Sequence, residues 1–400
     1  MRDSSFLRRL VVTVAVVFLV MVLVWLASKP IARFELGPGE VLRARPGVNL
    51  LLVGDGQGGW TRFDATARSA AHGVVLPASR GDPVLGPDGG AWLISDEGLL
   101  RFGAHGDPRV VLAADRLPDD ALLVGVPGMG PPLLSVPDGD ARVLAAPRED
   151  GSGLLELRTT DADGASAPLV VPPGAEVLCN PWSLSVAVPT DRGWTAWAPE
   201  DADDPTSPWH RALARDCTGD GAVFTPDGQG LIVPGVVDGL WLLDIRGGRL
   251  DFMADGNLGR SRRVPARVDF SRHPNPVLWC GQWTVDRVLH IVATHLGGGG
   301  RTQLKVSRVH DYNPALSWDG SLMVYCQAAF DEQGDEPFDE ALYCLDRFQT
   351  DLPAVYVDDR QGGLPDQGPL FVGTSDAFVY VANGDVHGVV LQRPAIESPP

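Results

Sequence analysis

Two clusters of like charge, opposite in sign, lie in the second half of the sequence. The acidic cluster spans 331–340, DEQGDEPFDE, and holds six carboxylates without a basic residue. Clustered oxygen atoms are the ligands that calcium takes, but the EF-hand spacing is absent, and a solvated hairpin loop explains the cluster more simply. We therefore favour the loop, with a calcium site as the alternative. The carboxylates are Asp331, Glu332, Asp335, Glu336, Asp339 and Glu340.

The basic cluster crowds five arginines into one short stretch, at Arg260, Arg262, Arg263, Arg267 and Arg272. Like charges this close repel one another unless negative groups offset them. Guanidinium groups bind carboxylates through two parallel hydrogen bonds. Our hypothesis is that the first three arginines and the acidic cluster either pair with each other or form a bipolar surface for a partner. Two solvated loops are the simpler alternative.

The other reactive side chains have no spacing that specifies a catalytic or metal site. The histidines His290 and His295 are five residues apart on an expected strand, which places them on opposite faces. No G-x-S-x-G sequence is present, which argues against a peptidase with an attached α/β-hydrolase domain. The cysteines lack the paired spacing of zinc sites and are Cys179, Cys217, Cys280, Cys326 and Cys344. We predict no catalytic residue, no metal ligand and no cofactor apart from the calcium alternative.

Two of the cysteines, Cys326 and Cys344, are expected on neighbouring strands that flank the acidic cluster. Cysteines on adjacent strands come close enough for a cross-strand disulfide. Small buried thiols are the second interpretation, and we favour it.

The composition indicates a turn-rich β-protein and argues against some partners. The 400 residues include 47 glycines and 34 prolines, too many for a helical protein, while 44% apolar residues suffice for a large core. A net charge of −18 repels nucleic acid. Of 33 basic residues only Lys29 and Lys305 are lysine, a bias typical of a GC-rich, bacterial genome.

The N-terminal segment has the features of a membrane anchor. Residues 10–27, LVVTVAVVFLVMVLVWLA, are apolar except for Thr13, and their number is close to the ~20 that a membrane-spanning helix needs. Three arginines precede this segment, so the positive-inside rule keeps residues 1–9 in the cytoplasm. We favour an uncleaved single-pass anchor over a signal peptide, because small residues are missing at the first cleavage position. The rest of the chain is then extracytoplasmic, and periplasmic in a Gram-negative cell.

A repeated unit of strand, tight turn and strand covers most of the remaining chain, and its clearest copy is 313–347. Successive first strands are spaced by 43 to 54 residues, as expected for four-stranded blades of roughly 40 to 50 residues. The spacing predicts an all-β fold, a single β-propeller of eight blades over 28–392, and 393–400 as a disordered tail. The eight copies, numbered in order, start near Leu42, Leu85, Leu134, Leu178, Phe224, Phe270, Leu316 and Leu370. Seven blades are the alternative if copy four, which starts near Leu178, is not a complete blade.

A tight turn is expected after each first strand, as RPG at 45–47, PDG at 87–89, 137–139 and 226–228, and WDG at 318–320. Copies four, six and eight depart from this pattern. Copy five is clear enough to predict all of its strands, at 222–225, 231–236, 240–245 and 249–253.

The segments FTPDGQGLIVPG, LSVPDGDARVLA and LSWDGSLMVYC resemble the TolB-like β-propeller repeat, which opens with an apolar residue, Ser-Pro-Asp-Gly and an apolar strand. The serine is retained at Ser135 and Ser317 but is replaced by Thr225 in copy five and Gly86 in copy two. The resemblance extends over about 36–392 and implies a propeller, without naming a partner.

Copy eight lacks a fourth strand, so we expect residues 32–36 to supply it and close the ring. In a blade, the loop between strands two and three opens on the same face as the connections between blades. The acidic cluster and the arginine cluster are therefore expected on one face, in neighbouring blades.

These features favour a membrane-anchored extracytoplasmic propeller that binds a protein or peptide of the cell envelope as a scaffold. The alternative is a propeller enzyme, a hydrolase or lyase acting on glycan or peptide, with its site in the central channel. Carboxylates or histidines from different blades meeting in one pocket would point to the enzyme, and their absence to binding.

Overall fold

The computed structural model describes most of the chain from residue 31 to residue 391. The parts that it leaves undescribed within this span are 66–72, 104–107, 161–164, 202–203, 218–220, 235–238, 256–267, 272–277, 286–287, 296–301, 304–308, 331–336, 347–353, 360–367 and 375–376. The predicted anchor at 10–27 and the predicted tail at 393–400 lie outside the described residues. Within the described part, the helices include none that has the length and apolarity to cross a membrane.

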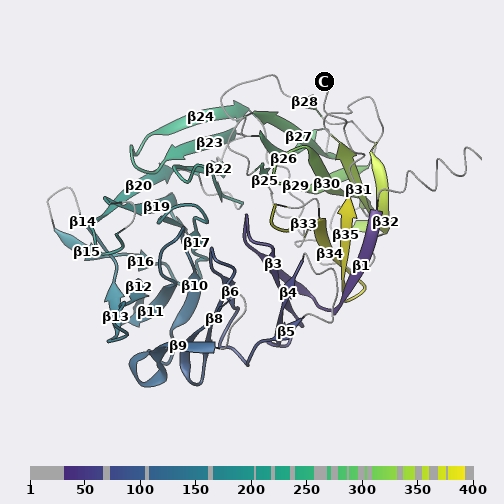
Figure 1. The fold of residues 1–400 in the computed structure, drawn as a ribbon. Coiled ribbons are helices and arrows are strands. Elements are labelled where there is room, and N and C mark those ends of the chain that lie inside the picture. The colour runs from purple at the N-terminus through teal and green to yellow at the C-terminus, as the bar shows by residue number, and fades with distance from the viewer. Residues whose placement is uncertain are drawn as a thin grey trace, which may run out of the picture.

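Eight sheets, here called blades 1 to 8, follow one another around a ring in sequence order (Figure 1). Five of them consist of four consecutive strands each. Blade 1 comprises β2 (Val41–Ala44), β3 (Leu50–Gly54), β4 (Trp60–Asp64) and β5 (Val74–Val75). Blade 2 comprises β6 (Val84–Leu85), β7 (Ala91–Ser95), β8 (Gly98–Phe102) and β9 (Pro108–Ala113). Blade 5 comprises β21 (Val223–Phe224), β22 (Gly230–Pro234), β23 (Gly239–Asp244) and β24 (Leu250–Asp255). Blade 6 comprises β25 (Val268–Phe270), β26 (Leu278–Val285), β27 (Val288–His295) and β28 (Thr302–Gln303). Blade 7 comprises β29 (His310–Leu316), β30 (Leu322–Phe330), β31 (Pro337–Asp346) and β32 (Val355–Asp359). A short 3-10 helix, Ala114–Arg116, follows blade 2.

The hydrophobic core lies between the blades. Strands such as β7 and β22 are buried at every position, because a middle strand of a blade is covered on both faces by its neighbours. Leu51 of blade 1, for example, packs in one cluster with Val379 of the last blade. This two-sided burial explains why the sequence reads as short apolar runs with little alternation.

Blade 8 is closed by a strand from the other end of the chain. Its sheet contains β33 (Leu370–Phe371), β34 (Ala377–Ala382) and β35 (Asp385–Leu391), and β1 (Ile31–Pro38) pairs with β35 on the outer edge. The register runs from Ile31 opposite Leu391 to Pro38 opposite Asp385. In Figure 1 the purple β1 lies beside the yellow β35. The prediction that residues 32–36 complete the ring is confirmed.

Blade 3 begins earlier than the sequence predicted. Its first strand is β10 (Leu122–Gly125), and the predicted start, Leu134, lies on its second strand, β11 (Leu133–Asp138). The PDG sequence at 137–139 therefore joins β11 to β12 (Ala141–Pro147), the third strand. The prediction was wrong because a Pro-Asp-Gly turn can join the second and third strands of a blade as well as the first and second.

The outer edge of blade 3 is divided between β13 (Leu154–Glu156) and β16 (Val170–Val171), which both pair with β12. A hairpin of β14 (Arg158–Thr160) and β15 (Ser166–Pro168) lies between them in sequence and leaves the blade. The hydroxyl of Thr159 donates to the carbonyl of Trp209 at 2.7 Å, which attaches this hairpin to the edge of blade 4.

Blade 4 is a complete blade, which rules out the seven-blade alternative. It contains β17 (Leu178–Cys179), β18 (Val186–Thr190), β19 (Gly193–Pro199) and β20 (Trp209–Arg215). Its first turn has no Pro-Asp-Gly. Asn180 stands at the position of Thr225, because its amide donates to the carbonyl of Ser185 as that of Thr225 donates to Gly230. Its Oδ1 accepts the amide of Trp182 at 3.0 Å. A different turn thus joins the same two strands.

The antiparallel order divides the loops between two faces of the ring. We call "turn face" the face with the loops between strands one and two and between strands three and four. The opposite "connector face" has the loops between strands two and three and the connections between blades. Because β1 runs antiparallel to β35 and starts opposite Leu391, Ile31 and Leu391 both lie on the turn face.

Candidate functional site

Most of the sequence-predicted binding residues lie outside the described part of the chain. These are Arg260, Arg262, Arg263, Asp331, Glu332, Asp335 and Glu336. The acidic loop is shorter than predicted, because β31 begins at Pro337 and so includes Asp339 and Glu340. Glu340 is only 7% exposed, so it is not part of a solvated loop. The proposed pairing of the two charged clusters remains a prediction.

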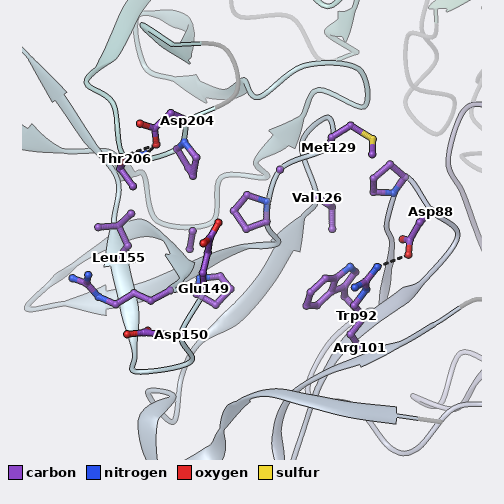
Figure 2. Close-up of a pocket in the computed structure, with 17 residues that line it drawn as sticks. Asp88, Trp92, Arg101, Val126, Met129, Glu149, Asp150, Leu155, Asp204 and Thr206 are labelled. Carbon is purple, nitrogen blue, oxygen red and sulfur yellow. Dashed lines mark hydrogen bonds and ion pairs between the residues drawn. The ribbon is translucent and has the colours of Figure 1, made fainter. Parts of the chain in front are cut away.

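A groove of about 700 Å³ opens on the turn face across blades 2, 3 and 4 (Figure 2). Its residues come from the first turns of blades 2 and 3, from the ends of β7 and β8, and from the loops between strands three and four of blades 3 and 4. Its lining consists of Pro87, Asp88, Trp92, Arg101, Val126, Met129, Gly130, Pro131, Ala146, Pro147, Arg148, Glu149, Asp150, Leu155, Asp204, Pro205 and Thr206.

One end of the groove holds a guanidinium between an aromatic ring and a carboxylate. Arg101 lies over the ring of Trp92, 5.4 Å from its centroid, and forms an ion pair with Asp88 (Figure 2). Asp88 also accepts the amide of Gly90 at 3.1 Å. Burial raises the pKa of Asp88, but the Gly90 amide and the Arg101 guanidinium outweigh that effect, so the net pKa is lowered. The carboxylate is therefore ionised at neutral pH.

The other end carries three carboxylates from two blades. Asp150 accepts the amide of Ser152 at 2.9 Å. Asp204 accepts the amide and the hydroxyl of Thr206, at 2.8 and 2.6 Å. These hydrogen bonds lower the pKa of both aspartates. Glu149, between them in Figure 2, makes no hydrogen bond or ion pair with the described residues.

Apolar residues connect the two charged ends. Met129 stands out among them because its side chain is 84% exposed, although the loop that carries it is firmly held. The amide of Gly128 donates to the carbonyl of Asn180 at 2.8 Å, and the amide of Gly130 donates to the carbonyl of Pro127 at 2.9 Å. An exposed thioether on a fixed loop is a feature of binding surfaces more than of a core.

The central channel is crossed at the turn face by Arg45, which the sequence analysis did not single out. This side chain is 7% exposed and leaves blade 1 at the turn between β2 and β3. Burial lowers the pKa of Arg45 to about 10, so the guanidinium is still charged at neutral pH. It donates to the carbonyls of Leu85 at 3.2 Å, Val126 at 2.5 Å, Gly128 at 2.6 Å and Pro181 at 2.9 Å, which belong to blades 2, 3 and 4.

The sequence contained a signal for Arg45 that was not used. The carbonyl of Arg45 accepts the amide of Val48, as the carbonyl of Ser317 accepts that of Gly320. Arg45 thus occupies the serine position of the repeat. In blade 7 the serine at this position stabilises its own turn, because the hydroxyl of Ser317 donates to Asp319 at 2.8 Å. An arginine in place of a short turn-forming side chain indicates a contact beyond its own blade.

No site for a metal ion is found among the described residues, where groups of three or more histidine, cysteine or carboxylate side chains suited to an ion are absent. None of the five cysteines forms a disulfide. On β30 and β31, Cys326 lies opposite Leu342 and Cys344 opposite Val324. Of the two interpretations of Cys326 and Cys344, buried thiols are correct.

The sequence matches no known protein family and no curated protein. The fold, in contrast, is well represented among solved structures. The WD40 domain of SCAP from fission yeast has a TM-score of 0.59 at 11% identity, over 92% of this chain and 99% of that one. The chain is a β-propeller. Two further propeller structures are similar at lower TM-scores: an oligogalacturonate lyase in complex with manganese at 0.48, with 14% identity over 92% of both chains, and TolB from Acinetobacter baumannii at 0.37, with 11% identity over 91% and 81%. The TolB-like resemblance holds at the level of the repeated blade alone.

Proposed function

We propose that this propeller is a protein- or peptide-binding module and that the groove across blades 2, 3 and 4 is its binding site. The observation that carries the proposal is the combination of an apolar floor with fixed, ionised carboxylates in one concave surface. Binding pockets commonly have volumes of about 300 to 1,000 Å³, and the volume of this groove lies in that range. Its lining combines apolar residues with six charged ones. An extended segment could lie along it and contact three blades at once.

The enzyme alternative is less well supported, although carboxylates from three blades do meet in this groove. A general acid needs a carboxyl group whose pKa is raised toward neutrality. The pKa values of Asp88, Asp150 and Asp204 are shifted in the opposite direction. Each of these aspartates also accepts hydrogen bonds that fix its own turn or loop. Such groups are suited to holding a positive charge and poorly suited to transferring a proton.

Arg45 reaches across the channel at the turn face, to carbonyls of blades 2, 3 and 4. Among the described residues, a cavity of about 100 Å³ lies beside it, lined by residues of blades 1, 6, 7 and 8. That cavity is too small for a glycan or peptide substrate.

We further propose that the module is anchored in the cell membrane by residues 10–27, with the propeller on the extracytoplasmic side, as part of an envelope scaffold. The composition of that segment supports the anchor. Since Ile31 lies on the turn face, a short link would hold this face, and with it the groove, toward the membrane. The sequence predicts the bipolar surface of Arg260, Arg262, Arg263 and the acidic loop for the opposite face.

The proposal is tested by photo-crosslinking in the cells that produce the protein. A photoreactive amino acid replaces Met129 in the groove, and in a second variant it replaces Val75 on the outer edge of blade 1, which is similarly exposed at 77%. We expect a discrete adduct from position 129 and none from position 75. Adducts of equal pattern from both positions, or none from position 129, would contradict the proposal.

A further inference from the structure

The charges that line the groove define the kind of peptide that it would accept. Six of its lining residues are charged, and four of them are carboxylates. One carboxylate is already paired, because Asp88 binds Arg101. Arg148 lies close enough to Asp150 to contribute to the lowering of its pKa. The remaining charge at the blade 3 and blade 4 end is negative.

The groove contains an example of how it holds a guanidinium. Arg101 places its charged head against the Asp88 carboxylate and its guanidinium plane over the indole of Trp92. A cation over an aromatic ring and a charge-assisted hydrogen bond reinforce each other when both are partly shielded from water. The other end has no aromatic ring, and Arg148, which acts on Asp150, is its cation. Glu149 makes no hydrogen bond or ion pair in the described part of the chain, and the apolar side chains of Leu155 and Met129 belong to the same lining. A carboxylate is therefore available there for a cation from outside.

We propose that the ligand of the groove is an extended cationic peptide segment. Its arginine or lysine heads bind Glu149, Asp150 and Asp204, and its apolar side chains or methylene stems cover Met129 and Leu155. This inference rests on the proposed function and specifies its partner. The net charge of −18 adds a long-range attraction for such a segment and repels acidic ones.

The side-chain geometry allows a charge to be removed with little effect on the fold. Asp150 and Asp204 each hold their loops through Oδ1, and an asparagine Oδ1 can accept the same hydrogen bonds. The variant Glu149→Gln/Asp150→Asn/Asp204→Asn therefore removes three charges but keeps the acceptors. A matched control is Glu40→Gln/Asp55→Asn/Asp140→Asn, which changes the net charge equally on the connector face. There Asp55 Oδ1 accepts the amides of Gln57 and Gly59 at 2.8 Å.

The test is fluorescence anisotropy with three labelled peptides in which leucine alternates with arginine, glutamine or glutamate. We expect the arginine peptide to bind wild type and the control variant with the same affinity, and to lose about tenfold in affinity to the groove variant, since exposed ion pairs are modest individually. The affinity should also fall as salt is added. Equal losses in the two variants would show attraction to net charge alone and would overturn the inference.

The outcomes separate this inference from the proposed function. If the glutamine or glutamate peptide binds as well as the arginine peptide, and the adduct at position 129 is still formed, the groove binds peptides but the cationic partner is wrong. If no peptide binds and position 129 gives no adduct, both proposals fail.

Discussion

The guanidinium of Arg45 donates a hydrogen bond of 2.6 Å to the carbonyl of Gly128 and thereby ties blade 1 to the loop that carries Met129. One side chain thus links four blades at the turn face and supports the wall of the groove. A charged donor shared among four carbonyls is worth more than an ordinary neutral hydrogen bond, and its loss leaves buried acceptors unpaired.

Replacing this side chain by Arg45→Ala should lower the free energy of unfolding by about 3 kcal/mol. Arg43→Ala is the control, because Arg43 lies two residues away and its ion pair with Asp82 is exposed, so its removal should cost about 0.5 kcal/mol. Denaturant unfolding in urea measures both. Millimolar guanidinium, added during thermal unfolding, should partly restore the stability of Arg45→Ala and leave that of Arg43→Ala unchanged. Equal destabilisation in the two variants would refute the bridging role.

The loop of Met129 depends on the glycine before it. Gly128 has a φ of 50°, and an added Cβ would lie 2.8 Å from the backbone carbon of Ser183. Gly139, with a φ of 59°, has no neighbouring atom within 4 Å of such a Cβ. Both Gly128→Ala and Gly139→Ala should lower the free energy of unfolding by about 1 kcal/mol, because alanine is strained at a positive φ. Only Gly128→Ala should lose further stability and weaken peptide binding, because its Cβ also meets the backbone of Ser183. Calorimetry together with the anisotropy assay checks this. If both variants lose the same stability and retain binding, Gly128 has no special role in the groove.

The closing strand is secured to blade 7 by a second group of polar contacts. The hydroxyl of Tyr380 donates to Asp358 at 2.5 Å, and Arg33 of β1 lies 3.4 Å from the same carboxylate. Tyr380→Phe should cost about 1 to 2 kcal/mol, because a partly buried, charge-assisted hydrogen bond is lost. Urea unfolding of this variant at neutral pH tests the contact. Unchanged stability would mean that the Tyr380 contact does not help to hold blade 8 against blade 7.

Alkaline pH should weaken the fold through the same tyrosine. Burial and the Asp358 carboxylate raise the pKa of Tyr380 above its ordinary value of 10. Burial likewise raises the pKa of Tyr325. A raised pKa means that the unfolded chain loses these protons first, so the free energy of unfolding should fall as the pH rises above 10. Tyr380→Phe should show a shallower fall, with the remainder due to Tyr325. A pH series of urea unfolding curves with the same slope in both proteins would contradict this assignment.

The cysteines should behave as protected thiols. Burial raises the pKa of Cys217 to about 11 and that of Cys179 to about 12, and both thiols are therefore protonated at neutral pH. Mass spectrometry after iodoacetamide treatment without reductant should find little labelling of the folded protein and five labels after unfolding. Three labels after unfolding would indicate a disulfide that the fold does not contain.

The repeat was readable from the sequence because each blade needs short apolar strands and a turn with positive φ. Asp319-Gly320 and Asp227-Gly228 mark such turns, and both glycines have φ near 70°. Where a different turn joins the first two strands, as at Asn180 in blade 4, the pattern was lost although the two strands still pair. In blade 3 the Pro-Asp-Gly sequence at 137–139 joins the second and third strands instead of the first and second, so the predicted start of this blade was one strand too late.

The groove could not be predicted because no short segment contains it. Asp88, Glu149 and Asp204 are separated by more than a blade's length of sequence and meet only because their loops share one face of the ring. Local charge density favoured 331–340 instead, since that signal needs no knowledge of which loops are neighbours. Arg45 was missed for the same reason, as all four of its acceptors belong to other blades.

Amide hydrogen exchange of the propeller with and without the partner captured at position 129 tests the central claim most directly. The account predicts slower exchange in the loops at 126–131, 148–153 and 204–207 on the turn face, with little change on the connector face. Protection confined to the connector face, around 331–340 and the arginine cluster, would show that the partner binds there and would contradict the groove as the binding site.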